Sequence, residues 1–121
     1  MTQEVAVIIG AGSIGVAIAR RVAVGRHLIL ADFSEATMAA VAEVLRGEGY
    51  ELSTHAIDIA DKAAVVALAE AAAERGAVTQ VVIAAGVSPV QATTERVLHV
   101  DLLGTSYLLE EFGRMIAPRV R

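Results

Sequence analysis

Three glycines in the stretch IIGAGSIGVAIARRV, Gly10, Gly12 and Gly15, have the spacing GxGxxG. Where a strand ends and a helix begins, this spacing forms a turn in which the N–H groups and the dipole of the helix bind a pyrophosphate. The spacing by itself is weak evidence, because ten glycines in 121 residues would produce it by chance in about one such chain in fifteen. Its meaning therefore depends on the segments on either side.

The flanking segments predict alternating strands and helices. Short runs rich in Val and Ile predict strands at 5–10, 27–32, 51–58 and 78–86. Between them, apolar residues recur three and four positions apart, which predicts helices at 13–23, 34–49 and 61–76. Such alternation is typical of the α/β class with a doubly wound parallel sheet, here in the strand order 3-2-1-4.

Local signals mark the ends of these helices and their buried sides. Ser34 and Asp61 are the expected N-caps, and glycines at 47 or 49 and at 76 are expected at the helix ends. In the second helix the expected core stripe consists of Met38, Val41, Val44 and Leu45. In the third helix it consists of Val65, Val66, Leu68, Ala69 and Ala72.

With a strand before it and a helix after it, the glycine motif is a candidate diphosphate site. Gly10 would permit the tight turn, Gly12 would let the backbone approach the diphosphate, and Gly15 would let the helix pack closely on the strand. Ser13 and Ile14, in the first turn of the same helix, belong to the predicted site. The alternative is a structural turn that binds no ligand.

A carboxylate follows the glycine motif at the end of the second predicted strand. Asp32 lies seventeen residues after Gly15, where it can accept both hydroxyls of an adenosine ribose and would repel a 2′-phosphate. Neither Ser13 nor Phe33 nor Ser34 supplies the cation that a 2′-phosphate would require. This pattern favours NAD over NADP, with Phe33 beside the same subsite. The alternative role for Asp32 is to cap the next helix, which Ser34 already does adequately.

Two more segments end predicted strands at the edge where open α/β sheets bind ligands. Asp58 and Ile59 close the third strand, and the triplet Ala84, Ala85 and Gly86 closes the fourth. Taken alone, Asp58 is as well explained as a loop or cap residue, and the triplet is unspecific. Together with the glycine motif and Asp32, they point to one crevice.

These motifs resemble the amino-terminal half of the short-chain dehydrogenase/reductase family over essentially the whole chain. The similarity runs through GAGSIG, Asp32, Asp58-Ile59 and Ala84-Ala85-Gly86, where the family has Asn-Asn-Ala-Gly or a variant. It continues in ERVLHVDLLGTSYLLEEF, which is similar to the family's long helix with an Asn-x-x-Gly segment, matched here at Gly104 and Thr105.

The resemblance implies a Rossmann-type dinucleotide-binding domain over residues 1–121. It implies that Asp58 and Ile59 hold the adenine, and that Ala84, Ala85 and Gly86 run beneath the nicotinamide ribose. In the complete protein it implies hydride transfer between NAD(H) and an alcohol or carbonyl, a small-molecule substrate.

Three departures from the family pattern bear on the chemistry. The glycine motif is one residue shorter than the family's TGxxxGxG, and the helix Asn of its proton relay is Asp101 here, a weak catalytic candidate. The family's catalytic Ser and Tyr-x-x-x-Lys are not found, since neither Tyr50 nor Tyr107 has a lysine four residues later and Lys62 is the only lysine.

These departures leave two functions open. In the first, which we favour, the chain is the nucleotide-binding half of an NAD-dependent oxidoreductase and lacks the carboxyl-terminal catalytic half. In the second, it is a self-contained, non-enzymatic regulatory domain that binds NAD(H).

Composition excludes several other classes. The net charge of −4 comes without a basic stripe, so neither nucleic acid nor a membrane surface is an expected partner. The chain has no cysteine, which rules out thiolate metal sites and disulfides and fits a cytoplasmic location. His27, His55 and His99 lack metal-ligand spacing, so we expect no metal.

The predicted helix at 94–117 carries too many apolar residues for one buried side. Val97, Val100, Leu108, Phe112 and Met115 form one face. Leu98, Leu102, Leu109 and Ile116 extend around the helix. A helix that is apolar on two sides needs cover on both, so we expect a homo-oligomer through this helix.

Overall fold

The computed structural model describes residues 3–84 and 104–114. In chain order its elements are β1 (Glu4–Ile9), α1 (Ser13–Val22), β2 (His27–Asp32), α2 (Glu35–Gly47), β3 (Leu52–Ala56), α3 (Lys62–Arg75), β4 (Ala77–Ile83) and α5 (Thr105–Gly113). The strands pair in parallel in the order β3-β2-β1-β4, which confirms the predicted α/β fold and strand order.

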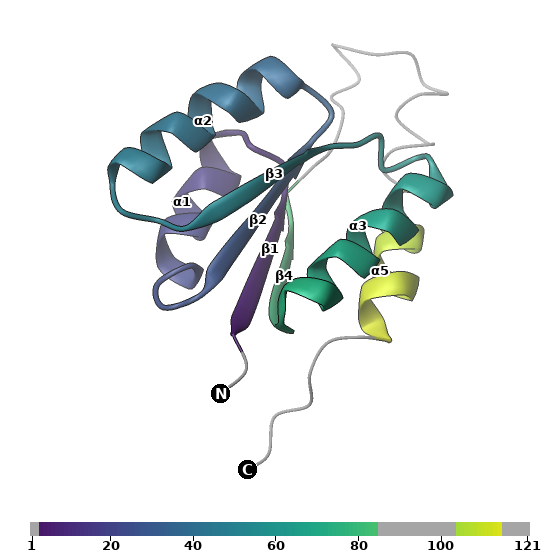
Figure 1. The fold of residues 1–121 in the computed structure, drawn as a ribbon. Helices are drawn as coiled ribbons and strands as arrows, with labels where there is room; N and C mark the ends of the chain where they lie inside the picture. Colours follow the sequence, from purple (N-terminus) through teal and green to yellow (C-terminus); the bar gives the residue numbers. More distant parts are fainter. Residues whose placement is uncertain (1–2, 85–103, 115–121) are drawn as a thin grey trace.

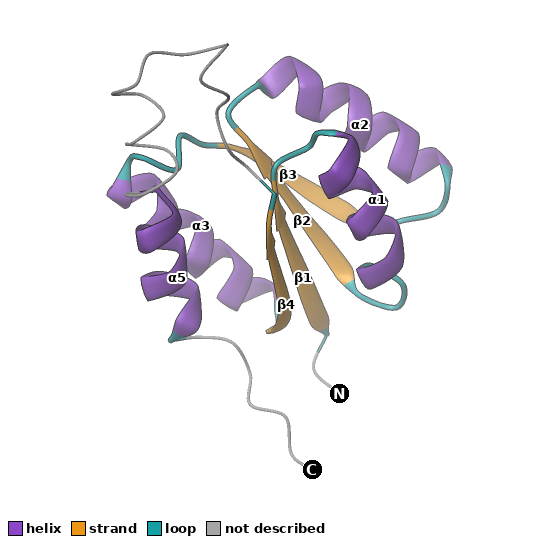
Figure 2. Ribbon diagram, turned by 180° about the vertical axis from the view of Figure 1, so that it is seen from behind, coloured by secondary structure: helices purple, strands orange, loops and turns teal. Residues whose placement is uncertain are grey.

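Helices cover both faces of this sheet. Figure 1 and Figure 2 show α1 and α2 against one face and α3 and α5 against the other. Residues 5–9 of β1 are completely buried, because the central strands of a parallel sheet are covered on both sides. Alternate residues along β1 and β2 therefore enter two separate apolar clusters, one on each face.

The predicted N-caps are confirmed. The hydroxyl of Ser34 accepts the N–H of Thr37 at the start of α2, and the carboxylate of Asp61 accepts the N–H groups of Ala63 and Ala64 at the start of α3. α2 ends at Gly47, and Gly76 follows α3 as its C-cap.

The core side of α2 differs from the prediction. Its buried residues are Met38, Ala42 and Leu45, whereas the side chain of Val44 is 53% exposed. The face of α2 that packs on the sheet includes Ala42, because a small residue lets the helix lie close to the strands. Counting large apolar residues alone therefore placed Val44 wrongly in the core. In α3 the buried residues are Val65, Leu68, Ala69 and Ala72, with Val66 half-buried.

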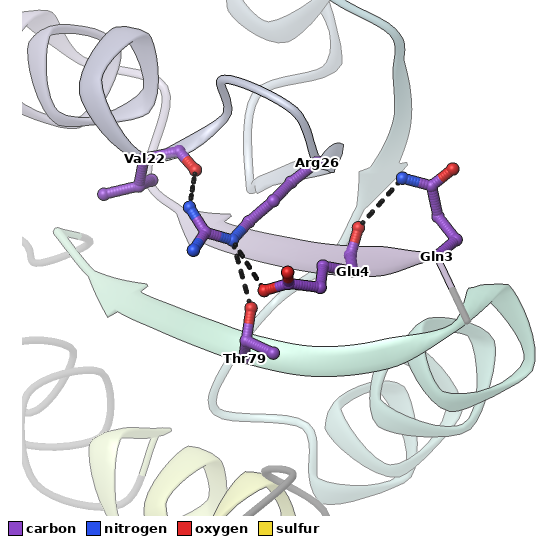
Figure 3. Close-up of polar contacts among 5 residues, drawn as sticks. All are labelled: Gln3, Glu4, Val22, Arg26 and Thr79. Carbon is purple, nitrogen blue, oxygen red and sulfur yellow. Dashed lines mark hydrogen bonds and ion pairs between the residues drawn. The ribbon is translucent and has the colours of Figure 1, made fainter. Parts of the chain in front are cut away.

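The amino-terminal edge of the sheet is held by a guanidinium. Arg26 donates from Nη1 to the carbonyl of Val22 at 2.7 Å and from Nε to the hydroxyl of Thr79 at 3.1 Å. The same Nε lies 3.3 Å from Oε1 of Glu4 (Figure 3). This side chain ties the end of α1 to β1 and β4 at the edge opposite the one where the strands end.

Only part of the predicted helix at 94–117 falls within the described residues. There, α5 buries Leu108 and Phe112, with Leu109 64% exposed. Among the described residues, no helix has the length and apolar character needed to cross a membrane.

Candidate nucleotide-binding site

The turn between β1 and α1 crosses the carboxyl-terminal edge of the sheet. The N–H of Gly10 donates to the carbonyl of Ala31 at the end of β2, at 2.7 Å, and Gly10 has φ = 113°. Residues that carry a side chain rarely adopt this backbone conformation, so glycine is favoured at this position. The turn therefore has the sharp reversal predicted for Gly10.

The other two glycines of the motif have opposite surroundings. A Cβ added at Gly15 would lie 2.0 Å from the carbonyl oxygen of Gly10, whereas one added at Gly12 would meet nothing within 4 Å. Gly15 thus lets α1 sit directly on the end of β1. The space above Gly12 is open, as close approach of a diphosphate to the backbone requires.

The start of α1 has the features of an anion site. Gly12 is its N-cap, no side chain caps the helix, and its first turn has no acidic residue. Ser13 and Ile14 are exposed, with Gly15 buried behind them. The first N–H groups of a helix have no partner within it and carry the positive end of its dipole. A diphosphate at this position would satisfy them.

Asp32 lies beside this turn. Its Oδ2 accepts the N–H of Ala11 at 2.6 Å, and its Oδ1 accepts the N–H of Ser34 at 2.9 Å. Ser34 is the residue that caps α2, so Asp32 does not occupy that cap position. Next to it, Phe33 is exposed. The carboxylate therefore sits between the glycine turn and the loop that follows β2, where the sequence predicted a ribose contact.

The third strand end is only partly suited to hold a base. The Asp58 carboxylate accepts the N–H of Ala60 at 3.0 Å within the loop that leads to α3. Ile59 is 6% exposed and packs against Gly104, where an added Cβ would lie 2.6 Å from its Cγ1. The side chain of Ile59 therefore belongs to the core under α5.

Of the predicted residues at the fourth strand end, one can be placed. The N–H of Ala84 donates to the carbonyl of Ile9 at 2.8 Å, which continues the pairing of β4 with β1. Ala85, Gly86 and the catalytic candidate Asp101 lie outside the described residues. The structure thus brings the glycine turn, Asp32 and Ala84 to one edge of the sheet.

Sequence reasoning missed the part played by Ala11. It did not single out this residue between two glycines, yet its N–H is the contact that joins the turn to Asp32. The glycine spacing marks the turn that contains Ala11. Its hydrogen-bond partner Asp32, however, lies 21 positions away, and no local pattern reveals that contact.

A second polar group lies near the amino ends of β2 and β3. Nδ1 of His27 is 3.0 Å from Oε1 of Glu51, and its Nε2 is 3.0 Å from the hydroxyl of Ser53. His27 is almost completely buried, and these contacts satisfy both nitrogens of its ring. Within residues 3–84 and 104–114, no three potential ligands gather as a metal site.

Comparison with known proteins places the chain in a family. The family model for short chain dehydrogenase matches residues 4–118. A short-chain dehydrogenase/reductase of Alternaria brassicicola is 41% identical over 116 residues, which are 96% of this chain and 42% of that protein. The chain thus spans less than half the length of this curated relative.

Solved structures agree with that assignment. A metagenomic short-chain oxidoreductase in complex with NADP is 28% identical, with a TM-score of 0.80 over 93% of this chain and 56% of the other. A short-chain dehydrogenase/reductase from Burkholderia phymatum in complex with NAD is 31% identical, with a TM-score of 0.77 over 94% of this chain and 44% of the other. Both cofactors therefore occur among its structural relatives. By its family match, its curated relative and its fold, this chain belongs to the short-chain dehydrogenase family.

Proposed function

We propose that this chain is the nucleotide-binding part of an oxidoreductase that transfers hydride between NAD(H) and an alcohol or carbonyl substrate. The observation that carries the proposal is the position of the Asp32 carboxylate, hydrogen-bonded to the N–H of Ala11 in the glycine turn. In this position an acidic side chain suits a ribose with free hydroxyls.

The residues of the turn fit a dinucleotide. The open space at Gly12 and the helix start without a side-chain cap match the needs of a diphosphate. When bound, the nicotinamide ring would accept or supply the hydride. In this proposal Gly10, Gly12, Ser13, Ile14 and Gly15 hold the diphosphate. The ribose meets Asp32, with Phe33 beside it.

The remaining assignments follow from the family resemblance. Asp58 and the main chain of Ile59 would meet the adenine, and Ala84, Ala85 and Gly86 the nicotinamide ribose. Family membership favours this function over a stand-alone regulatory domain. NAD is the proposed cofactor because Asp32 would meet a 2′-phosphate with like charge, and the residues after it offer no cation.

The test compares NADH and NADPH by calorimetry on the wild-type chain and on Asp32→Ala. We expect NADH to bind wild type about tenfold more tightly or better, the size of effect expected from a like-charge contact. The difference in affinity between NADH and NADPH should be smaller in Asp32→Ala, mainly because the affinity for NADH falls. A wild-type chain that binds both equally would remove the case for NAD, and one that binds neither would overturn the proposed function.

A further inference from the structure

Asp32 uses both carboxylate oxygens to accept backbone N–H groups, one from the glycine turn and one from the loop after β2. Oδ2 accepts the N–H of Ala11 at 2.6 Å, and Oδ1 accepts that of Ser34 at 2.9 Å. Hydrogen bonds to an ionised group are shorter and stronger than those between neutral groups. One side chain therefore connects the turn between β1 and α1 to the loop between β2 and α2.

The glycine turn has a reason to need this connection. Two of its residues, Gly10 and Gly12, have the wide conformational freedom of glycine, and ordering them is entropically unfavourable. Between them, Ala11 is only 2% exposed and belongs to the apolar cluster under α1 and α2. Without Asp32, its N–H would be a buried donor without the partner that it has here, which is destabilising.

We propose that Asp32 is a positioning residue for the diphosphate turn as well as a contact for the ribose. By holding the N–H of Ala11, it keeps Gly12 and the first turn of α1 in the conformation that receives the diphosphate. The ribose and diphosphate subsites are then coupled through one carboxylate. This inference rests on the proposed function and goes beyond a ribose contact, because it assigns Asp32 an effect on a part of the ligand that carries no ribose hydroxyl.

Electrostatics makes the two roles separable. If Asp32 served only the ribose, removing its negative charge would leave diphosphate binding unchanged or strengthen it, since like charges repel. If Asp32 also positions the turn, its removal weakens diphosphate binding in spite of the lost repulsion. The two roles thus predict opposite signs for a ligand that lacks ribose hydroxyls.

The probe is 2′,3′-dideoxy-ADP, which retains the adenine and diphosphate but has no ribose hydroxyl at the positions that Asp32 would contact. The variant is Asp32→Ala, which removes the charge and both acceptor oxygens, so that neither the Ala11 N–H nor the Ser34 N–H keeps its side-chain partner. Glu35→Gln is the matched control, because Glu35 is exposed in the first turn of α2 and loses the same charge.

Calorimetry should show about a tenfold loss of dideoxy-ADP affinity in Asp32→Ala, the order expected when a hydrogen bond to a charged group is lost. Glu35→Gln should stay close to wild type. Equal or tighter binding by Asp32→Ala would overturn the positioning role. Thermal melting of each variant checks that the fold is retained.

Amide hydrogen exchange of the ligand-free chain gives an independent readout. The Ala11 N–H should be protected in wild type and in Glu35→Gln and should exchange faster in Asp32→Ala. Unchanged protection in Asp32→Ala would overturn the inference even if nucleotides bind. If wild type binds neither ADP nor the dideoxy analogue while Ala11 remains protected by Asp32, the proposed function fails and the coupling of the two subsites fails with it.

Discussion

His55 shows how a single side chain can link the fold to pH. It lies in β3 and lines a cavity of about 320 Å³ with Ile29, Ser53, Ala71, Glu74 and Arg75. Partial burial lowers the pKa of His55, because removal from water disfavours the charged imidazolium. The unfolded chain therefore takes up a proton at this residue at a higher pH than the folded chain does.

We predict that acid destabilises the chain partly through His55. Above a pH of about 6.5, the usual histidine value, the residue is neutral in both states and contributes no pH dependence. As the pH falls below that value, the unfolded state is protonated first and the free energy of unfolding decreases until the folded pKa is reached. Between pH 7.5 and pH 5, the free energy of unfolding measured with urea should decrease less in His55→Gln than in wild type. The same decrease in both would show that His55 does not contribute.

At the scale of elements, the contact between α1 and β1 decides the shape of the nucleotide turn. α1 begins at Ser13 directly above the end of β1, and the backbone atoms of Gly15 and Gly10 approach each other closely. Gly12, two residues after Gly10, faces open space. Two glycines of one motif thus have different surroundings: Gly15 lets α1 pack on β1, and Gly12 faces the space that the proposed diphosphate would occupy.

Substitution by alanine should separate the effects of these surroundings. Gly15→Ala forces its Cβ against the Gly10 carbonyl, and overpacking of this kind costs about 1–3 kcal/mol of stability. Gly12→Ala has room and an ordinary φ of −74°, so loss of the N-cap glycine should cost at most about 1 kcal/mol. Its added methyl group should nevertheless weaken NADH binding. Urea midpoints and NADH titration measure the two effects. Equal stability of the two variants would contradict the packing role of Gly15.

At the scale of the whole molecule, one side of the described structure has little cover. In the described sheet, β4 pairs with β1 alone and forms an edge, and its residues after Val78 are only partly buried. On the same side, α5 packs against α3 and buries Leu108 and Phe112. Leu109 points away from that contact. Exposed strand edges and apolar helix faces favour association.

We predict that the 121-residue chain self-associates at micromolar concentration. Light scattering should give a mass above the 12.6 kDa of one chain, and Leu109→Glu should shift it toward that value. Val24→Glu is the control, because Val24 is equally exposed but lies in the connection between α1 and β2. A wild-type mass that stays near that of one chain would contradict the prediction.

Local sequence was sufficient for much of the fold and for the outline of the candidate site. Helix periodicity, the caps at Ser34 and Asp61 and the runs that form the strands depend on residues close together in the chain. The strand order 3-2-1-4 follows from the right-handed connections of parallel strands only when the fourth strand is placed on the other side of the first. The glycine spacing and the acid after the second strand predicted the candidate site, because both are short-range patterns attached to the ends of predicted strands.

Tertiary structure alone decided which distant groups meet. The hydrogen bond from Ala11 to Asp32 joins residues 21 positions apart, and the contacts of His27 with Glu51 and Ser53 join residues 24 and 26 positions apart. Ile59, predicted to serve the adenine, has its side chain buried because Gly104 lets the chain pack on it. Periodicity and spacing record which residues are apolar and how they repeat. Which atoms complete each other's hydrogen bonds and packing depends on how the folded chain brings separate elements together.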